Sequence, residues 1–163
     1  MRKIMYFILI LLIFIVFFYN TNVYPKLYAW YASTQINYVE KSIKLNTANY
    51  QNIRDIKVSE SSITGEGENN DPSIIIPLDD GPVTTINFDI TVLQDDTVQV
   101  FYLDKDNSSF NEIHSLKTLV HNGDNVVTLK IPIEASLKPM ISIRIDPVQT
   151  NQRFSIKNLY INK

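Results

Sequence analysis

The stretch that decides the fold is "TTINFDITV", residues 84–92, in which polar and apolar side chains alternate without a break. Its apolar residues share one parity: Ile86, Phe88, Ile90 and Val92. Successive side chains of a β-strand point to opposite faces of a sheet, so this segment is predicted to be a strand with one buried and one solvated face. Such one-sided strands are typical of antiparallel sheets.

Other segments repeat this period of two. In "VVTLKIP" (126–132) and "ISIRIDP" (141–147), the predicted inward sets are Val127, Leu129 and Ile131, and Ile141, Ile143 and Ile145. Less regular candidates lie at 42–46, 56–60, 73–78, 98–103 and 153–161. Turn-forming residues separate them: Gly65 and Gly67, Asp80-Gly81-Pro82, Gln94-Asp95-Asp96, and Asn122-Gly123-Asp124. The pattern predicts an all-β domain over residues 42–163, an antiparallel β-sandwich (jelly roll) of about eight strands.

The last predicted strand, 153–161, changes parity in its middle. Phe154 and Ile156 share one parity, whereas Leu159 and Ile161 share the other. All four reach the core only if the strand contains a one-residue bulge near Lys157-Asn158.

The amino-terminal segment differs from the rest of the chain. Residues 4–18 carry no charge, and Arg2 and Lys3 precede them. We expect an uncleaved signal anchor: residues 1–3 in the cytoplasm, a transmembrane helix at 4–22, and a juxtamembrane helix or linker at 23–41. The lipid bilayer is then the partner of residues 4–22, and the protein is a single-pass cell-membrane protein whose β-domain is extracellular or periplasmic. The alternative is a cleaved signal peptide, although Ala29 and Ala32 fit a cleavage site poorly.

Composition excludes several function classes. The chain has 15 basic and 17 acidic residues, and two of the basic ones precede the apolar segment. The remaining acidic surplus argues against a surface that tracks nucleic-acid phosphates. Cysteine is absent, so the sequence offers neither a disulfide framework nor a thiolate nucleophile.

No motif predicts a catalytic centre, a metal or a cofactor. "DKDNSSFNE" (104–112) begins like a calcium-binding loop, but Ser109 and Ser115 replace its glycine and its bidentate glutamate. Structural calcium held by backbone oxygens is not readable from a sequence. His114 and His121 are the only histidines, and we expect them at a strand edge and in a turn. The paired acids lie at predicted turns, where turn formation explains them: Asp79-Asp80 and Asp95-Asp96.

Two sets of residues within the predicted sandwich are candidates for ligand contact. Sugar rings stack on exposed aromatic side chains, which here means Tyr102, Phe110 or Tyr160, although each suits the core equally. Arg144 and Asp146 alternate with the isoleucines of 141–147 and are predicted on the outer face. An ion pair at this position is worth only about 0–1 kcal/mol if it is exposed, and a large loss of stability on removing Arg144 would show it to be buried. We favour a structural corner before Pro147 over a binding site.

An ordered set of short motifs spans residues 64–161: Asp71-Pro72, Gln99, Phe101-Tyr102, Phe110, Glu112, Gly123, Asn125, Arg144 and Asp146-Pro147. Taken in order, these positions resemble a galactose-binding-like jelly-roll domain of bacterial envelope proteins, which is often joined to glycosyltransferases and other membrane proteins of surface-polysaccharide assembly. The chain departs from the pattern at Val148 and within 151–153, where the family has glycines. The resemblance implies a jelly-roll fold and an envelope context, and it adds Glu112 to the ligand-binding candidates Tyr102, Phe110, Arg144 and Asp146.

These features lead to one expectation and one alternative. We expect a non-catalytic, membrane-anchored β-sandwich that binds an envelope glycan, or acts as a scaffold, in cell-envelope polysaccharide assembly. The alternative is a protein-interaction subunit that docks on a membrane glycosyltransferase without binding sugar. An enzyme, such as a glycan hydrolase, would need converging carboxylates or a Ser-His pair, and the sequence shows neither.

Overall fold

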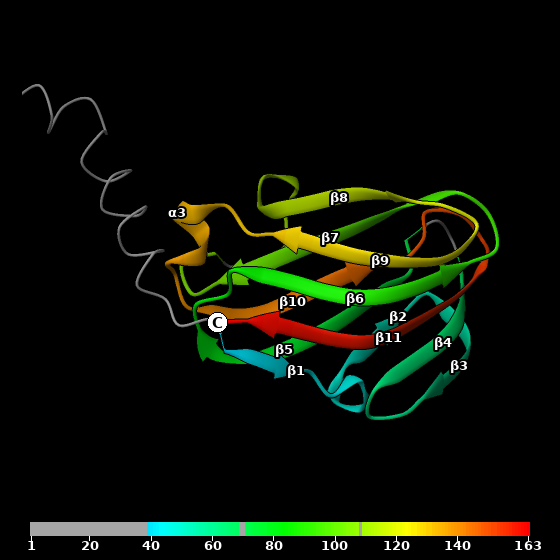
Figure 1. The fold of residues 1–163 in the computed structure, drawn as a ribbon, viewed down its shortest axis with the longest axis horizontal. Coiled ribbons are helices and arrows are strands. Elements are labelled where there is room, and N and C mark those ends of the chain that lie inside the picture. Colours follow the sequence, from blue (N-terminus) through cyan, green and yellow to red (C-terminus); the bar gives the residue numbers. More distant parts are fainter. Residues whose placement is uncertain (1–38, 69–70, 108) are drawn as a thin grey trace, which may run out of the picture. The chain divides into compact units, whose positions relative to one another are not determined.

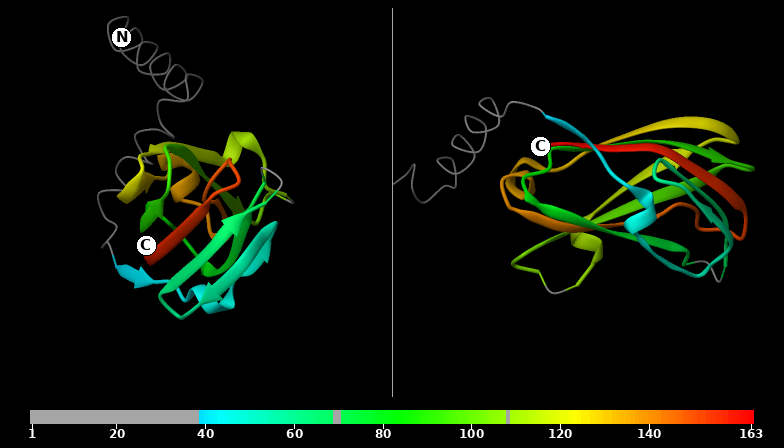
Figure 2. Two further views of the ribbon diagram at one scale, coloured as in Figure 1. Left: turned by 90° about the vertical axis from the view of Figure 1, so that its right-hand side faces the viewer. Right: turned by 90° about the horizontal axis from the view of Figure 1, so that it is seen from below.

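The computed structural model describes residues 39–163, apart from 69–70 and 108. Two antiparallel β-sheets pack face to face (Figures 1 and 2). The six-stranded sheet has the order β3-β4-β11-β6-β9, with β1 beside β11: β1 (Glu40–Ser42), β3 (Ile53–Val58), β4 (Ser62–Gly67), β6 (Thr85–Val92), β9 (Gly123–Lys130) and β11 (Arg153–Asn162). The five-stranded sheet has the order β2-β5-β10-β7-β8: β2 (Asn49–Gln51), β5 (Ser73–Gly81), β7 (Asp96–Asp104), β8 (Ser115–Val120) and β10 (Met140–Asp146). The described helical turns are η1 (Leu45–Thr47), η2 (Glu112–His114) and α3 (Ile133–Ser136).

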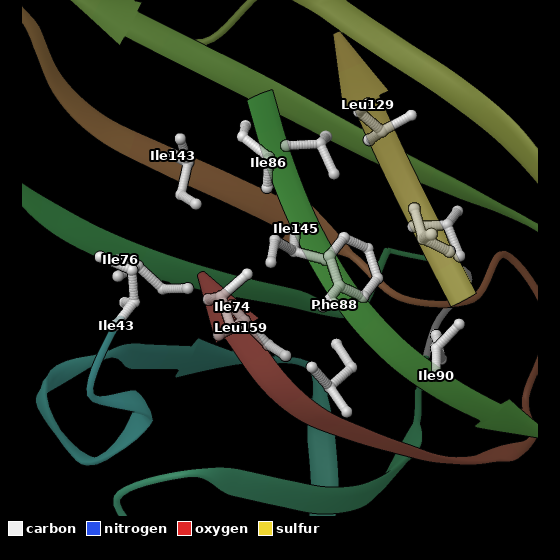
Figure 3. Close-up of a cluster of buried hydrophobic side chains, with 14 of the residues drawn as sticks. Ile43, Ile74, Ile76, Ile86, Phe88, Ile90, Leu129, Ile143, Ile145 and Leu159 are labelled. Atoms are coloured by element: carbon white, nitrogen blue, oxygen red, sulfur yellow. The ribbon is translucent and has the colours of Figure 1, made fainter. Parts of the chain in front are cut away.

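The predicted all-β antiparallel sandwich is confirmed, with more strands than expected. Its core lies between the sheets, where isoleucines of β6 meet those of β5 and β10 (Figure 3). The segment 84–92 behaves as its alternation predicts, because its four inward side chains are each no more than 1% exposed. The inward set of β9 and its continuation, Val127, Leu129 and Ile131, is also buried.

The predicted bulge in β11 is confirmed. The register of β11 against β6 shifts between Lys157 and Tyr160, and Asn158 adopts a positive φ of 53°. Asparagine tolerates this left-handed conformation better than most residues. Its side-chain amide donates a hydrogen bond to Asp89 Oδ2 at 2.7 Å. The four apolar residues on either side of the bulge all reach the core: Phe154, Ile156, Leu159 and Ile161.

The prediction that Ile141 lies in the core is wrong. The pairing of β10 with both of its neighbours shifts register between Met140 and Ser142. Met140 therefore takes the inward position and is 1% exposed, while Ile141 is only half-buried. Ile143 and Ile145 lie in the core as predicted.

Two local predictions in the first half of the domain are also wrong. The segment 42–46 is not a continuous strand, because β1 ends at Ser42 and the chain turns into η1, which buries Leu45 completely. Gly65 and Gly67 do not separate strands but lie inside β4, on its inward face. They fit because other side chains fill the space that a Cβ would take: Ile53 at Gly65, and Pro72 and Val148 at Gly67.

The predicted membrane span at 4–22 lies outside the described residues, as does the segment 23–38. Within the part of the chain that the structure describes, no helix is long and apolar enough to cross a membrane. Glu40 and Lys41 belong to β1 and pair with β11.

The domain begins and ends at the same end of the sandwich. Val39 and Lys163 exchange two backbone hydrogen bonds of 3.1 Å, and the C-terminus lies beside the start of β1 (Figure 1). The connection between β10 and β11 lies at the opposite end (Figure 1).

Candidate functional site

The outer face of the five-stranded sheet carries a polar pocket of about 520 Å³. Antiparallel pairing sets Arg144 of β10 opposite Phe101 of β7, and Asp146 opposite Gln99. Paired residues share a face of the sheet, so these side chains stand together on the side away from the core. We call this pocket the Arg144 pocket; it is lined by Asp71, Gln99, Phe101, Glu112, Lys117, Arg144, Asp146, Val148 and Gln149.

Arg144 and Asp146 form a two-point ion pair at the centre of the pocket. Arg144 donates from Nε to Asp146 Oδ1 at 2.7 Å and from a terminal nitrogen to Oδ2 at 2.9 Å, and it also contacts Asp71. The outer-face position was predicted correctly, and the structure shows that the pair is largely buried there. The Arg144 and Asp146 side chains are only 20% and 11% exposed, because neighbouring strands and the segment that carries Asp71 surround them.

Burial shifts the pKa of both members of this pair. It raises the pKa of Asp146 above its ordinary value, and the hydrogen bonds from Arg144 offset that rise only in part. The negative charges of Asp71 and Glu112 raise it further. For Arg144, burial lowers the pKa, but the interactions with Asp146 and Asp71 outweigh it and raise the pKa overall. The pocket therefore places three carboxylates around one strongly held guanidinium.

Glu112 reaches the pocket from η2. Asn111 caps this turn by accepting a hydrogen bond from the His114 backbone N–H at 3.1 Å. The Glu112 carboxylate accepts a hydrogen bond from Gln99 Nε2 at 2.9 Å and pairs with Lys117 Nζ at 3.1 Å. The Lys117 and Gln99 hydrogen bonds hold the pKa of Glu112 below its ordinary value. Glu112 therefore stays ionised at the rim as a fixed hydrogen-bond acceptor.

The three candidate aromatic platforms, Tyr102, Phe110 and Tyr160, do not line the pocket. The prediction that Tyr102 contacts a ligand is wrong. Its side chain lies in the core, 4% exposed, and is therefore not available for ring stacking. Phe110 is half-buried with its ring against the edge of Phe101, at a centroid distance of 6.4 Å. Phe101 lines the pocket but is 7% exposed, because the Arg144 guanidinium covers it at 5.2 Å from the ring centroid.

Asp96 fixes the side of the pocket formed by Val148 and Gln149. Its Oδ1 accepts hydrogen bonds from the backbone N–H groups of Thr97 (2.7 Å) and Gln149 (3.0 Å). Its Oδ2 accepts from the Thr150 backbone and hydroxyl and from Gln152 Nε2 at 2.6 Å. Burial raises the pKa of Asp96, but these hydrogen bonds outweigh it and lower the pKa overall. Asp96 thus joins the start of β7 to the β10–β11 connection.

The structure brings together three of the five predicted site residues, Glu112, Arg144 and Asp146. Lys117 and Asp96 gave no signal in the sequence, because a lysine on an outer face and an aspartate in a turn are ordinary there. Gln99 did give a signal in the sequence, because an amide inside the apolar run 98–103 needs a hydrogen-bond partner when it is buried.

The described residues hold no cluster of three or more acidic, histidine or cysteine side chains arranged for a metal ion. In the segment 104–112, the Asp104 carboxylate instead accepts hydrogen bonds from Asp106 N (2.9 Å), Asn107 N (3.1 Å) and Asn107 Nδ2 (2.7 Å). These contacts close a turn.

No family model matches the chain, and no curated protein matches it. Among solved structures, a family 29 carbohydrate-binding module aligns with a TM-score of 0.55 and 11% identity, over 78% of this chain and 90% of that one. A mutant module of the same family, complexed with mannohexaose, aligns with a TM-score of 0.53 and 11% identity, over 78% of this chain and 93% of that one. A structure described as CBM4 aligns with a TM-score of 0.55 and 9% identity, over 72% of this chain and 96% of that one. At these identities the likeness shows the fold.

Proposed function

We propose that the domain is a non-catalytic glycan-binding module and that the Arg144 pocket is its binding site. The observation that carries this proposal is the pocket on the outer sheet face, where charged and amide side chains surround one guanidinium. The carbohydrate-binding modules that share the fold support it.

Sugar hydroxyls both donate and accept hydrogen bonds, so a sugar needs donors and acceptors side by side. Asp71 and Glu112 supply acceptors at the rim, where their side chains are 61% and 70% exposed. Lys117 supplies a donor, 50% exposed. Because Arg144 covers the Phe101 ring, recognition relies on charge-assisted hydrogen bonds instead of ring stacking.

The test is calorimetric titration of the full chain with hexose oligomers, including mannohexaose. The protein is kept in a detergent without a sugar headgroup, which would compete for the site. Glu112→Gln should weaken binding about tenfold, the equivalent of one charge-assisted hydrogen bond. Glu134→Gln, on exposed α3, is the matched control and should bind as the wild type does. Absence of binding across mannose, glucose and galactose oligomers would overturn the proposal.

Three carboxylates in one pocket also raise the question of hydrolysis, which needs a carboxylic acid placed to protonate a leaving group. Both oxygens of Asp146 face Arg144 at 2.7 and 2.9 Å, and Asp71 also contacts Arg144. Glu112 is held as a carboxylate by Gln99 and Lys117, so none of the three is placed as that acid. We therefore expect no turnover. Incubating the bound oligomer with the full chain should produce no new reducing ends, and their appearance, abolished by Asp146→Asn, would identify an enzyme.

The cellular setting belongs to the same proposal: an anchor at 4–22, the domain outside the membrane, and a role in cell-envelope polysaccharide assembly. The apolar residues 4–18 behind Arg2 and Lys3 support it. Protease added to intact spheroplasts should digest the β-domain. Its protection until the membrane is opened would contradict the expected orientation.

Docking on a membrane glycosyltransferase is the second candidate. It is favoured by two exposed apolar side chains near the pocket, Ile113 beside Glu112 and Leu119 on edge strand β8, which are 86% and 74% exposed. Crosslinking in membranes separates the two candidates. A trapped glycosyltransferase without glycan affinity in the purified chain would favour docking.

A further inference from the structure

A second groove, of about 590 Å³, lies over the six-stranded sheet. It is separate from the Arg144 pocket, which belongs to the other sheet and shares no lining residue with it. Strands β3, β4, β6 and β11 all contribute to it. We call it the Ser155 groove; it is lined by Asp55, Ile56, Lys57, Thr64, Gly65, Thr91, Leu93, Arg153, Phe154 and Ser155.

A row of three hydroxyl residues crosses the groove. Ser155 of β11 is paired with Thr64 of β4 on one side and with Thr91 of β6 on the other, so their side chains share the outer face. The Thr91 hydroxyl donates to Asp124 Oδ1 at 2.6 Å. Ser155 Oγ is buried and has no hydrogen-bond partner among the described residues. The row therefore has hydrogen-bonding capacity that the protein itself leaves unused.

Two cations line the groove. Lys57, paired with Thr64 across β3 and β4, is exposed and has no carboxylate within 4.0 Å in the described part of the chain. Arg153 is 71% exposed and reaches Glu66 Oε2 at 3.6 Å. Glu66 also binds Arg54, which in turn lies 3.9 Å from Glu68, so these four side chains balance in charge and, among the described residues, Lys57 is the unpaired cation of the groove. Asp55 is the only carboxylate that lines the groove.

Apolar side chains complete the groove. Ile56 and Leu93 are 37% and 62% exposed and give the groove an aliphatic surface. The lining thus combines hydroxyls, surplus positive charge and aliphatic surface. In the Arg144 pocket, by contrast, three carboxylates outnumber two cations.

We propose that the Ser155 groove is a second glycan-binding site and that it takes an acidic glycan. Lys57 and Arg153 would hold its carboxylate or phosphate, while Thr64 and Ser155 hydrogen-bond its hydroxyls. This inference goes beyond the proposed function and does not depend on it, since the two sites lie on different sheets. A module with both sites can bridge two polymers.

The test compares an acidic ligand with its neutral form and with a second kind of acid. Oligogalacturonate and its neutral methyl ester share a backbone, so they isolate the effect of the carboxylate charge. Poly(glycerol phosphate) presents phosphate in place of carboxylate. Each is titrated calorimetrically into the full chain at low and high salt. We expect the methyl ester to bind more weakly than the acid, and added salt to weaken binding of the acid, because an exposed ion pair is screened. The two acidic probes tell a carboxylate ligand from a phosphate ligand.

Variants assign the binding to the groove. Lys57→Gln/Arg153→Gln should weaken binding of the acidic probe by at least about tenfold. Lys130→Gln, on the same sheet at edge strand β9, removes an exposed charge elsewhere and should leave affinity unchanged. Circular dichroism verifies that each variant is folded.

Two results would overturn the inference. One is failure of both acidic probes to bind. The other is binding that the double variant does not weaken, or that Lys130→Gln weakens equally, since the contact would then be general surface charge. Neither result bears on hexose binding in the Arg144 pocket, so the two proposals fail separately.

Discussion

Arg144 holds Asp146 from two positions earlier on the same strand, through contacts of 2.7 and 2.9 Å. Residues i and i+2 of a strand point to the same face, so the local geometry of β10 brings them together. The burial of the pair, however, comes from β7 and the segment that carries Asp71. An ion pair at this depth stabilises little compared with apolar residues, but removing one partner is costly.

Arg144→Met should therefore destabilise the fold by about 2–4 kcal/mol, because it leaves the Asp146 carboxylate buried without its partner. Urea denaturation followed by circular dichroism measures the change. The matched control is Arg153→Met on β11, where the side chain is 71% exposed, and it should change stability by less than about 0.5 kcal/mol. Equal effects of the two substitutions would show that Arg144 is not held in a buried pair.

The raised pKa of Asp146 predicts a distinctive pH dependence. Between the ordinary Asp pKa of about 3.9 and the raised folded value, the folded protein binds more protons at Asp146 than the unfolded chain does. That contribution stabilises the fold below this window and is lost as pH rises through the folded pKa. Asp146→Asn removes it, so the variant should lose stability more steeply than the wild type on acidification toward about pH 4.

Asp96→Asn should change the pH dependence of stability in the opposite direction. The pKa of Asp96 is lowered in the folded protein, so the stabilising contribution of its carboxylate is present at neutral pH and is lost as pH falls through the folded value. This variant should therefore lose stability less steeply on acidification than the wild type does. Denaturation midpoints measured across the pH range distinguish the two cases, and parallel curves for both variants would contradict the assignment.

Asp96 also links stability to the pocket. Asp96→Ala leaves the Gln149 and Thr150 N–H groups without the acceptor they share. We expect a loss of about 2–4 kcal/mol, since several hydrogen bonds to a charged group disappear together. Gln149 lines the Arg144 pocket, so hexose affinity should fall as well, under conditions where the variant is still folded. Unchanged affinity would show that the β10–β11 connection does not shape the site.

The sequence predicted the fold where apolar residues alternate regularly. In β6, β9 and the bulged β11, the parity of the alternating apolar residues places the inward side chains, because only one face can be buried. It failed at Ile141, where a register shift beside Met140 changes the parity. It failed again at Gly65, since glycine within a strand and glycine in a turn look the same until the neighbour that fills its space is known.

The candidate site was predictable only in part, for a related reason. The alternation of β10 placed Arg144 and Asp146 on the outer face, yet their burial depends on residues far away in the chain. Tyr102 and Phe101 are neighbours with opposite orientations, and composition alone did not show which one faces the core. Partners such as Lys117 become visible only once the pairing of β7 with β8 is known.

The close approach of Gly67 to Val148 provides a final prediction. A Cβ built on Gly67 would lie 2.9 Å from Val148 Cγ2 and 3.0 Å from Pro72 Cγ. Gly67→Ala should therefore destabilise the fold by about 1–3 kcal/mol through overpacking. Val148→Ala opens the space, so the double variant should be less destabilised than the sum of the single variants. Urea denaturation of the four proteins measures this coupling. Additive effects would show that Val148 does not limit the space at Gly67, leaving Pro72 as the contact that excludes a side chain there.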